Sequence, residues 1–223
     1  MVNLGKNALL LCLIASGLSA CSNYARDVAD TVKLATTGLP DANISPDYIK
    51  KLPYASVYIQ VDDAAKVFSV LAEVENNKEL KWVTADHYLL TTKNGRVIKT
   101  IGFSEDITHT SNTDNDPLAQ GITMLNTHPK WESTVFWSKV FKSGYKITSE
   151  FEPEGVEQIK ILDQEKKLIR YDEHCEVAEL NYKYTNHFWL DPITNKVVKS
   201  EQYMGPGLPV LKITTLKQYS SGS

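Results

Sequence analysis

Five histidines are the residues of this sequence best suited to bind a metal or to transfer a proton. They are His87, His109, His128, His174 and His187. Zinc sites usually take pairs of ligands from within about five residues of one another, and no two of these histidines are that close. His174 has Cys175 as its neighbour, but adjacent residues of a strand point to opposite faces of a sheet. The spacing therefore predicts neither a metal site nor a cysteine–histidine catalytic pair.

Acidic side chains offer a second arrangement to consider. Asn112, Asp114 and Asp116 resemble the first ligands of a calcium-binding loop. The sixth position of that loop is Pro117 and the twelfth is Thr123, where an EF-hand requires Gly and Glu. We interpret Asp116 instead as the N-cap of a helix whose first residue is Pro117, with a weak cation site as the alternative.

Glu150 and Glu152 would share one face of a strand, because residues i and i+2 align there. A glycosidase needs two carboxylates about 5–9.5 Å apart across a cleft, and the sequence does not place this pair across one. The chain contains no G-x-S-x-G, P-loop or dinucleotide-binding motif. The sequence thus predicts no catalytic residues and no cofactor.

Cys21 is the cysteine with the clearest chemical context. An apolar run of about eleven residues from Ala8 to Leu18 follows the basic Lys6, which is typical of a secretory signal and too short to span a bilayer. Small residues stand at 19 and 20, directly before Cys21. This order resembles the lipobox of bacterial lipoproteins. An ordinary secretory signal with an incidental cysteine and an uncleaved membrane anchor are the alternatives.

The lipobox resemblance implies cleavage of residues 1–20 and acylation of Cys21 with chains such as palmitate. Each buried methylene contributes about 0.8 kcal/mol to membrane binding, so several chains would hold the protein permanently. In such lipoproteins an aspartate after the cysteine marks retention in the inner membrane, and here Ser22 follows. We therefore expect a lipid anchor in the outer membrane, with the protein facing the periplasm.

The mature chain has a nearly balanced charge. Without residues 1–20 the 223-residue chain keeps 203 residues, and the loss of one lysine leaves 23 basic against 27 acidic residues. This balance gives no sign of a nucleic-acid-binding surface. Cys12 leaves with the signal and Cys21 takes lipid, so Cys175 has no disulfide partner within the chain.

The remaining chain divides into a lipidated tether over 21–46, a β domain over 47–219 and a tail over 220–223. Apolar residues at helical spacing between 24 and 35 indicate a short helix in the tether. Asn94-Gly95 between two β-rich runs is the strongest hairpin signal. We predict strands around it and over 57–61 and 66–73, a loop over 104–116 and a short helix over 118–125.

Further strands are predicted over 133–141, 145–151, 156–162, 168–177, 182–190, 196–204 and 210–217, separated by turn residues. The fold class is therefore mainly β: a single antiparallel curved sheet, as a half-barrel or a sandwich, with one or two short helices. Aromatic residues on these strands are expected to fill the core, with one ring of Phe136-Trp137 and one of Phe188-Trp189 on the exposed face.

Several short motifs occur in the order found in one family of lipoproteins. They are Leu52-Pro53-Tyr54, Lys81-Trp82, Asn94-Gly95-Arg96, Lys99-Thr100, Asp116-Pro117-Leu118, Trp131 and Phe188-Trp189-Leu190-Asp191. From the lipobox nearly to the C-terminus the chain resembles the YjbF/GfcB family of outer-membrane lipoproteins. That resemblance implies a mainly β protein in exopolysaccharide or group 4 capsule production, with no established catalytic residues. The C-terminal strands also resemble the half-barrels of periplasmic lipoprotein carriers, a likeness of pattern alone.

The first hypothesis is a non-enzymatic accessory lipoprotein of exopolysaccharide or capsule export. Its partners would be the outer membrane, an outer-membrane β-barrel protein of the same system, and polysaccharide. The second hypothesis is a carrier that encloses an acyl chain or a glycan in a curved-sheet cavity, which an apolar-lined cavity would distinguish from a filled core. The third is a polysaccharide-modifying enzyme, which would require two facing carboxylates in a cleft.

Overall fold

The computed structural model describes residues 41–75, 78–84, 88–124, 128–139 and 144–220. Cys21 and the predicted tether helix lie outside these residues. Residues 41–223 form one compact unit. No helix in the described part of the chain is both long and apolar enough to cross a bilayer.

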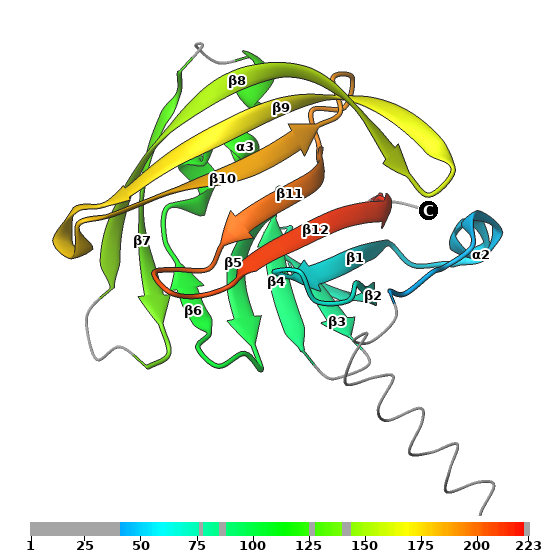
Figure 1. Ribbon diagram of the computed structural model, residues 1–223, viewed down its shortest axis with the longest axis horizontal. Helices are drawn as coiled ribbons and strands as arrows, with labels where there is room; N and C mark the ends of the chain where they lie inside the picture. Colours follow the sequence, from blue (N-terminus) through cyan, green and yellow to red (C-terminus); the bar gives the residue numbers. More distant parts are fainter. Residues whose placement is uncertain (1–40, 76–77, 85–87, 125–127, 140–143, 221–223) are drawn as a thin grey trace, which may run out of the picture. The chain divides into compact units, whose positions relative to one another are not determined.

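In the described residues, twelve antiparallel strands form one sheet, and strands that follow one another along the chain are hydrogen-bonded neighbours except β5 and β6, which are its two edges (Figure 1). In addition, the last strand, β12, pairs with the first, β1. The strands are β1 Ser56–Val61, β2 Val67–Val74, β3 Leu80–Thr84, β4 Leu89–Lys93, β5 Arg96–Ile101, β6 Ile107–Thr110, β7 Lys130–Trp137, β8 Tyr145–Ile161, β9 Gln164–Val177, β10 Tyr182–Leu190, β11 Val197–Tyr203 and β12 Val210–Lys217.

The sheet curls until its two edge strands, β5 and β6, lie side by side (Figure 1). Two threonines join them: Ile107 N donates to Thr100 Oγ1 at 2.9 Å, and Thr110 Oγ1 donates to the carbonyl of Ile98 at 3.2 Å. The carboxylate of Asp106 accepts from Thr100 Oγ1 at 2.9 Å in the connection between the two strands. The fold is therefore a nearly closed barrel whose seam is held by side chains.

Short helices occupy the connections. Among the described residues, the α-helices are α2 Pro46–Lys51 and α3 Pro117–Gln120, and the 3₁₀ turns are η1 Thr113–Asn115, η2 Ile122–Met124 and η3 Ala178–Leu180. As predicted, Pro117 begins α3, and the carboxylate of Asp116 caps it by accepting from Leu118 N at 3.0 Å. Before α2, Asp41 Oδ1 accepts from Lys66 N at 2.8 Å, so contacts with the sheet begin ahead of residue 47.

The interior of the barrel holds the main core. Alternate residues of the strands meet there, including Val57, Trp82, Trp137 and Leu211. Leu118 of α3 extends this core against the inner residues of β7 to β10. Because every described strand lies within residues 41–220, this unit contains a complete sheet and its own core, which is what a domain needs to fold by itself.

The Asn94-Gly95 turn forms as predicted. Both residues have positive φ, 51° and 88°, as a type I′ hairpin requires. The stretch 67–74 is a strand, also as predicted. These features depend on local chemistry, which a sequence pattern records directly.

Three predicted boundaries were wrong. Residues 104–116 contain strand β6, which was missed because only Ile107 and Thr110 of it are buried. The expected break at 153–155 is instead a bulge within the continuous strand β8, where an exposed proline costs no ladder hydrogen bond. The helix expected over 118–125 ends at Gln120 and continues only as the 3₁₀ turn η2.

Candidate functional site

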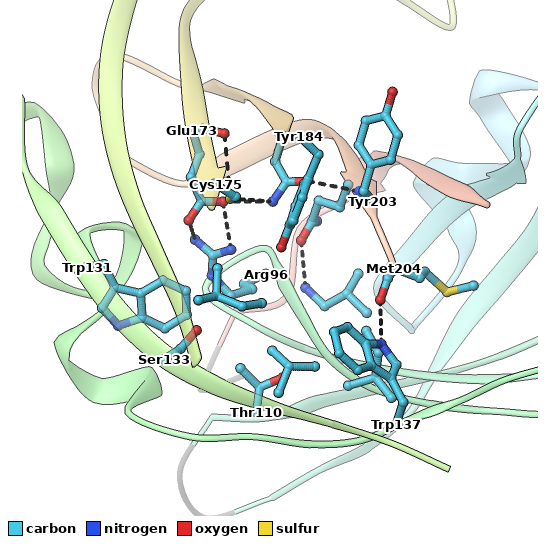
Figure 2. A pocket seen from close by; sticks show the side chains of 16 residues that line it. Arg96, Thr110, Trp131, Ser133, Trp137, Glu173, Cys175, Tyr184, Tyr203 and Met204 are labelled. Carbon is cyan, nitrogen blue, oxygen red and sulfur yellow. Dashed lines mark hydrogen bonds and ion pairs between the residues drawn. The ribbon is translucent and has the colours of Figure 1, made fainter. Parts of the chain in front are cut away.

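Arg96 is a buried charge in the barrel interior, with only 6% of its surface exposed. The Asn94-Gly95 turn places it at the start of β5, facing inward (Figure 2). Its Nη1 and Nη2 donate to Glu173 at 2.9 and 3.0 Å, and its Nε and Nη2 donate to Asp116. The guanidinium therefore joins β5 to β9 and to the cap of α3.

Aromatic rings cover the faces of this guanidinium. The Cζ atom of Arg96 lies 4.3 Å from the centre of the Trp131 ring, 5.3 Å from Phe188 and 5.9 Å from Phe151. A desolvated cation over an aromatic face gains about 2 kcal/mol or more. The rings thus exclude water and offset part of the cost of burying the charge.

Glu173 is fully buried and has its own set of donors. Ser149 Oγ donates to Oε1 at 2.9 Å and Asn186 Nδ2 donates to Oε2 at 2.8 Å, both from neighbouring strands. Asp116 and Glu173 raise the pKa of Arg96, against the effect of burial. Burial raises the pKa of Asp116, against the effect of Arg96. The three ionisable groups are engaged with one another rather than presented to a substrate.

A small cavity of about 40 Å³ adjoins this network (Figure 2). Its wall includes Arg96, Thr110, Ser133 and Tyr184. At about 10–15 Å³ for each water, this volume has room for a few water molecules and is too small for a sugar ring or an acyl chain. We conclude that the network holds the barrel together rather than binding a substrate.

Gln202 makes the same kind of link across the interior. From β11 its Oε1 accepts from Val97 N at 3.0 Å, and its Nε2 donates to the carbonyl of Gly95 at 2.9 Å. The side-chain amide therefore satisfies backbone groups at the start of β5. Together with Arg96, it fixes the hairpin tip against the far wall of the barrel.

Cys175 and His174 lie on opposite faces of β9, as the strand geometry predicted. Cys175 is buried in the interior with 4% exposure, and burial raises the pKa of its thiol well above the ordinary value. His174 is exposed on the outer face, with its Nε2 3.4 Å from Glu152. A buried neutral thiol is a poor nucleophile, so this cysteine packs as an apolar residue.

A second cavity, of about 510 Å³, lies between the Asn94-Gly95 hairpin, β1, β3, β11 and β12. Its buried wall comprises Val57, Trp82, Thr92, Leu118, Val198, Ser200 and Ile213. Exposed polar residues form its rim, namely Lys78, Asn94, Lys196 and Gln218. A cavity of this kind is the feature that distinguishes a carrier from a filled core, and it makes this region the candidate binding site.

The acidic residues weighed from the sequence do not converge. The carboxylate of Asp114 accepts from Lys93 Nζ at 2.7 Å, while that of Asp116 turns inward to Arg96. On the outer face Glu150 pairs with Lys130, with the charged atoms 3.4 Å apart. Over the described ranges, no group of three or more His, Cys, Asp or Glu residues is placed to hold a metal ion.

All four tryptophans are buried, which confirms their expected place in the core. The expectation of one exposed ring in Phe188-Trp189 was wrong. Phe188 lies in the interior, and Trp189 on the opposite face is buried with Leu168 and Val198 and covered by Lys199, whose Nζ lies 3.9 Å above its ring. The long β8–β9 hairpin contributes to this second cluster, a contact that residue alternation alone does not reveal.

The partnership of Arg96 with Glu173 was missed from the sequence. The two residues stand 77 positions apart, and neither belongs to a recognisable catalytic motif. An arginine directly after a turn glycine is normally predicted to have a solvent-exposed side chain. Three successive residues are buried at the start of β5, Arg96, Val97 and Ile98, so a period-two pattern does not identify Arg96 as buried.

These features define a class of protein: a nearly closed antiparallel barrel with a buried cluster of mutually paired ionic groups and a cavity at one end. Residues 29–216 match the family described as "Group 4 capsule polysaccharide lipoprotein gfcB, YjbF". The chain belongs to this family.

Two proteins of Escherichia coli (strain K12) are similar to the chain over nearly its whole length. The uncharacterized lipoprotein GfcB is 26% identical over 94% of this chain and 97% of its own. The uncharacterized lipoprotein YjbF is 29% identical over 94% of this chain and 95% of its own. The crystal structure of the hypothetical lipoprotein YmcC from Escherichia coli (K12) shares the fold, with a TM-score of 0.73, 24% identity, and coverage of 86% of this chain and 96% of that one.

Proposed function

We propose that this protein is a non-enzymatic lipoprotein of the outer membrane, accessory to the production or export of exopolysaccharide or group 4 capsule. The family match over residues 29–216 carries the proposal, because the description of the family names a group 4 capsule polysaccharide lipoprotein. In this role the lipid on Cys21 holds the β domain at the membrane on its periplasmic side. There the domain binds a β-barrel protein of the polysaccharide system or the polysaccharide itself.

The chemistry of the interior supports a non-enzymatic role. General acid–base catalysis requires a titratable group within hydrogen-bond reach of a bound substrate. The buried groups Arg96, Asp116 and Glu173 reach one another, and the cavity beside them is too small for a sugar ring. Of the acidic pair on β8, Glu150 forms an ion pair with Lys130, and Glu152 lies 3.4 Å from Nε2 of His174.

A gene deletion in a host that makes the polysaccharide tests the role. We expect the deletion to lower surface polysaccharide, measured as cell-associated uronic acid or hexose, and the wild-type gene to restore it. Complementation with Cys21→Ala should restore little if location is what the protein contributes. Normal polysaccharide output in the deletion strain, while the neighbouring polysaccharide genes are expressed, would refute the proposal.

The non-enzymatic part has its own assay. The purified chain beginning at Ser22 should release no reducing ends from the polysaccharide. Turnover that disappears when one carboxylate is neutralised, for example by Glu152→Gln, would instead identify an enzyme. The Lys160→Glu variant, on the exposed part of β8, controls for effects of surface charge.

A further inference from the structure

The 510 Å³ cavity falls within the range of about 300–1,000 Å³ that small-molecule sites occupy. Its buried wall is largely aliphatic, with Val57, Leu118, Val198 and Ile213 around the indole of Trp82. Such a wall gains about 25 cal/mol for each Å² of apolar surface that a ligand removes from water. The interior of the cavity therefore favours a hydrocarbon occupant.

Each polar side-chain atom of the buried wall already has one hydrogen-bond partner within the protein. Trp82 donates its only N–H to Thr92 Oγ1 at 2.8 Å, and Ser200 Oγ accepts from Gln202 at 2.9 Å. A sugar ring carries several hydroxyls, and each one left buried without a partner costs about 1–3 kcal/mol. The wall thus suits an acyl chain better than a saccharide.

The rim of the cavity carries unneutralised positive charge. Lys78 and Lys196 are exposed there, and neither has an ion-pair partner in the described part of the chain. Lys196 Nζ lies 3.4 Å from the carbonyl of Tyr219, which leaves its charge in place. Glu75 is the one carboxylate of the lining, and it shares Lys81 with Glu73 outside the lining, so two lysines of the lining stand against one carboxylate. The rim therefore favours an anionic head group.

Asn195 supplies an acceptor that the protein does not use. It lines the cavity, and its Oδ1 is buried with no hydrogen-bond partner among the described residues. A buried acceptor of this kind requires a donor. A hydroxyl group on the occupant, held near the rim, would provide it.

We propose that this cavity binds a single-chain amphiphile whose head group carries an anionic group and at least one hydroxyl. The acyl chain lies against Trp82 and the aliphatic wall, the anion lies between Lys78 and Lys196, and the hydroxyl donates to Asn195 Oδ1. This inference goes beyond the proposed role in polysaccharide production and does not require it. A lipid in the cavity would give the domain a ligand separate from its own covalent anchor.

Calorimetric titration of the chain beginning at Ser22 tests the proposal. The probe is 1-myristoyl-lysophosphatidylglycerol, kept below its micelle concentration. We expect saturable binding of one molecule per chain. Lysophosphatidylcholine with the same acyl chain, which lacks both the net charge and the hydroxylated terminus, should bind about tenfold more weakly, or about 1.4 kcal/mol. Glycerol phosphate, which has no chain, should not bind measurably.

Variants locate the site. Thr215→Trp fills the cavity and should lower the affinity at least about tenfold, whereas Thr214→Trp, on the other face of β12, should leave it unchanged. The double variant Lys78→Glu with Lys196→Glu should weaken lysophosphatidylglycerol and spare lysophosphatidylcholine, with Lys160→Glu as the charge control. If Thr215→Trp does not fold, Asn195→Gly, which keeps the positive φ of 58°, provides a second test by weakening the binding of lysophosphatidylglycerol.

Three results would overturn the inference. One is the absence of saturable binding to the wild-type chain. Another is binding that a folded Thr215→Trp variant, or Asn195→Gly, leaves unchanged, because this would place the lipid elsewhere on the surface. The third is an oligosaccharide without an acyl chain that binds and loses affinity in the cavity variants. Normal polysaccharide in the deletion strain would refute the proposed function alone and leave this binding intact.

Discussion

Individual residues of the barrel interior show how an ionic cluster is retained inside an apolar core. Arg96 meets two carboxylates and three aromatic rings, while Glu173 also accepts from Ser149 and Asn186. Desolvation makes such a cluster a weak source of stability as a whole. Removing a single member is different, because the groups left behind have no water to solvate them.

Arg96→Met should destabilise the domain by about 3–5 kcal/mol, because it leaves two buried carboxylates without a cation. Arg170→Met is the matched control. Arg170 also makes a double contact with a carboxylate, that of Asp172, but its guanidinium is partly exposed on the outer face and its removal leaves Asp172 in contact with His187 at 2.7 Å, so a smaller loss is expected. Urea unfolding of the chain beginning at Ser22 measures both. Equal losses in the free energy of unfolding would show that the buried cluster contributes no more to stability than the outer pair does.

Asp116 gives the interior a pH dependence of known sign. Burial raises its pKa above the ordinary value of 3.8. A carboxyl group with a raised pKa holds its proton more tightly in the folded state, so its contribution to stability is present below pH 3.8 and is lost as the pH rises through the folded-state pKa. Asp116→Asn retains helix capping and removes the titration. The free energy of unfolding of the wild type, minus that of the variant, should therefore fall as the pH rises.

Asp172 supplies a control of opposite sign for this measurement. Burial opposes its ionisation, but hydrogen bonds from Arg170 and His187 lower its pKa below 3.8. Its contribution is present above that ordinary pKa and is lost as the pH falls through the folded-state value. The free energy of unfolding of the wild type, minus that of Asp172→Asn, should thus rise with pH. If the corresponding difference for Asp116→Asn also rises with pH, the raised pKa of Asp116 is contradicted.

At the scale of the elements, two connections control the barrel. The Asn94-Gly95 hairpin directs Arg96 inward and borders the cavity, and the Asp106 connection ties β5 to β6. Both connect strands that are adjacent in sequence, and the second of them connects the two edge strands of the sheet. These connections hold the edges together once the curl of the sheet has brought them side by side.

Gly95→Val should destabilise the domain by more than about 1 kcal/mol, since a β-carbon is costly at a φ of 88°. The added β-carbon would also collide with the side chain of Val197, which requires the hairpin to move. Gly155→Val isolates the backbone effect, because it also has positive φ but has no atom within 4 Å of the added Cβ. The unfolding midpoints of the two variants should differ, with Gly95→Val the lower. Equal midpoints would mean that the contact with Val197 is unimportant.

At the scale of the whole molecule, the domain and its attachment are separate properties. Residues 41–223 form a compact unit, while the predicted lipid site at Cys21 lies outside it. A nearly neutral domain gains little from membrane electrostatics, so acyl chains would determine where it resides. Loss of the acyl chains should therefore change where the domain resides without disturbing its fold.

Cys21→Ala should abolish labelling with palmitate and stop processing at the lipoprotein site, because the thiol is the group that accepts the lipid. The variant protein should leave the membrane fraction and keep the unfolding midpoint of the wild-type domain. Cys175→Ala is the matched control and should label normally, because that thiol is buried. Palmitate labelling that persists in Cys21→Ala would refute the lipoprotein assignment of this cysteine.

The sequence by itself determined what depends on neighbours along the chain: the β class, the Asn94-Gly95 turn, the Asp116 cap of α3 and the family. Tertiary structure alone decided the closure at β5 and β6, the continuity of β8, the pairing of Arg96 with Glu173 and the cavity near Trp82. The physical reason is that turns and caps arise from hydrogen bonds over a few residues. Closure, buried ion pairs and cavities instead depend on how the sheet curls, which brings together residues separated by 77 or 105 positions.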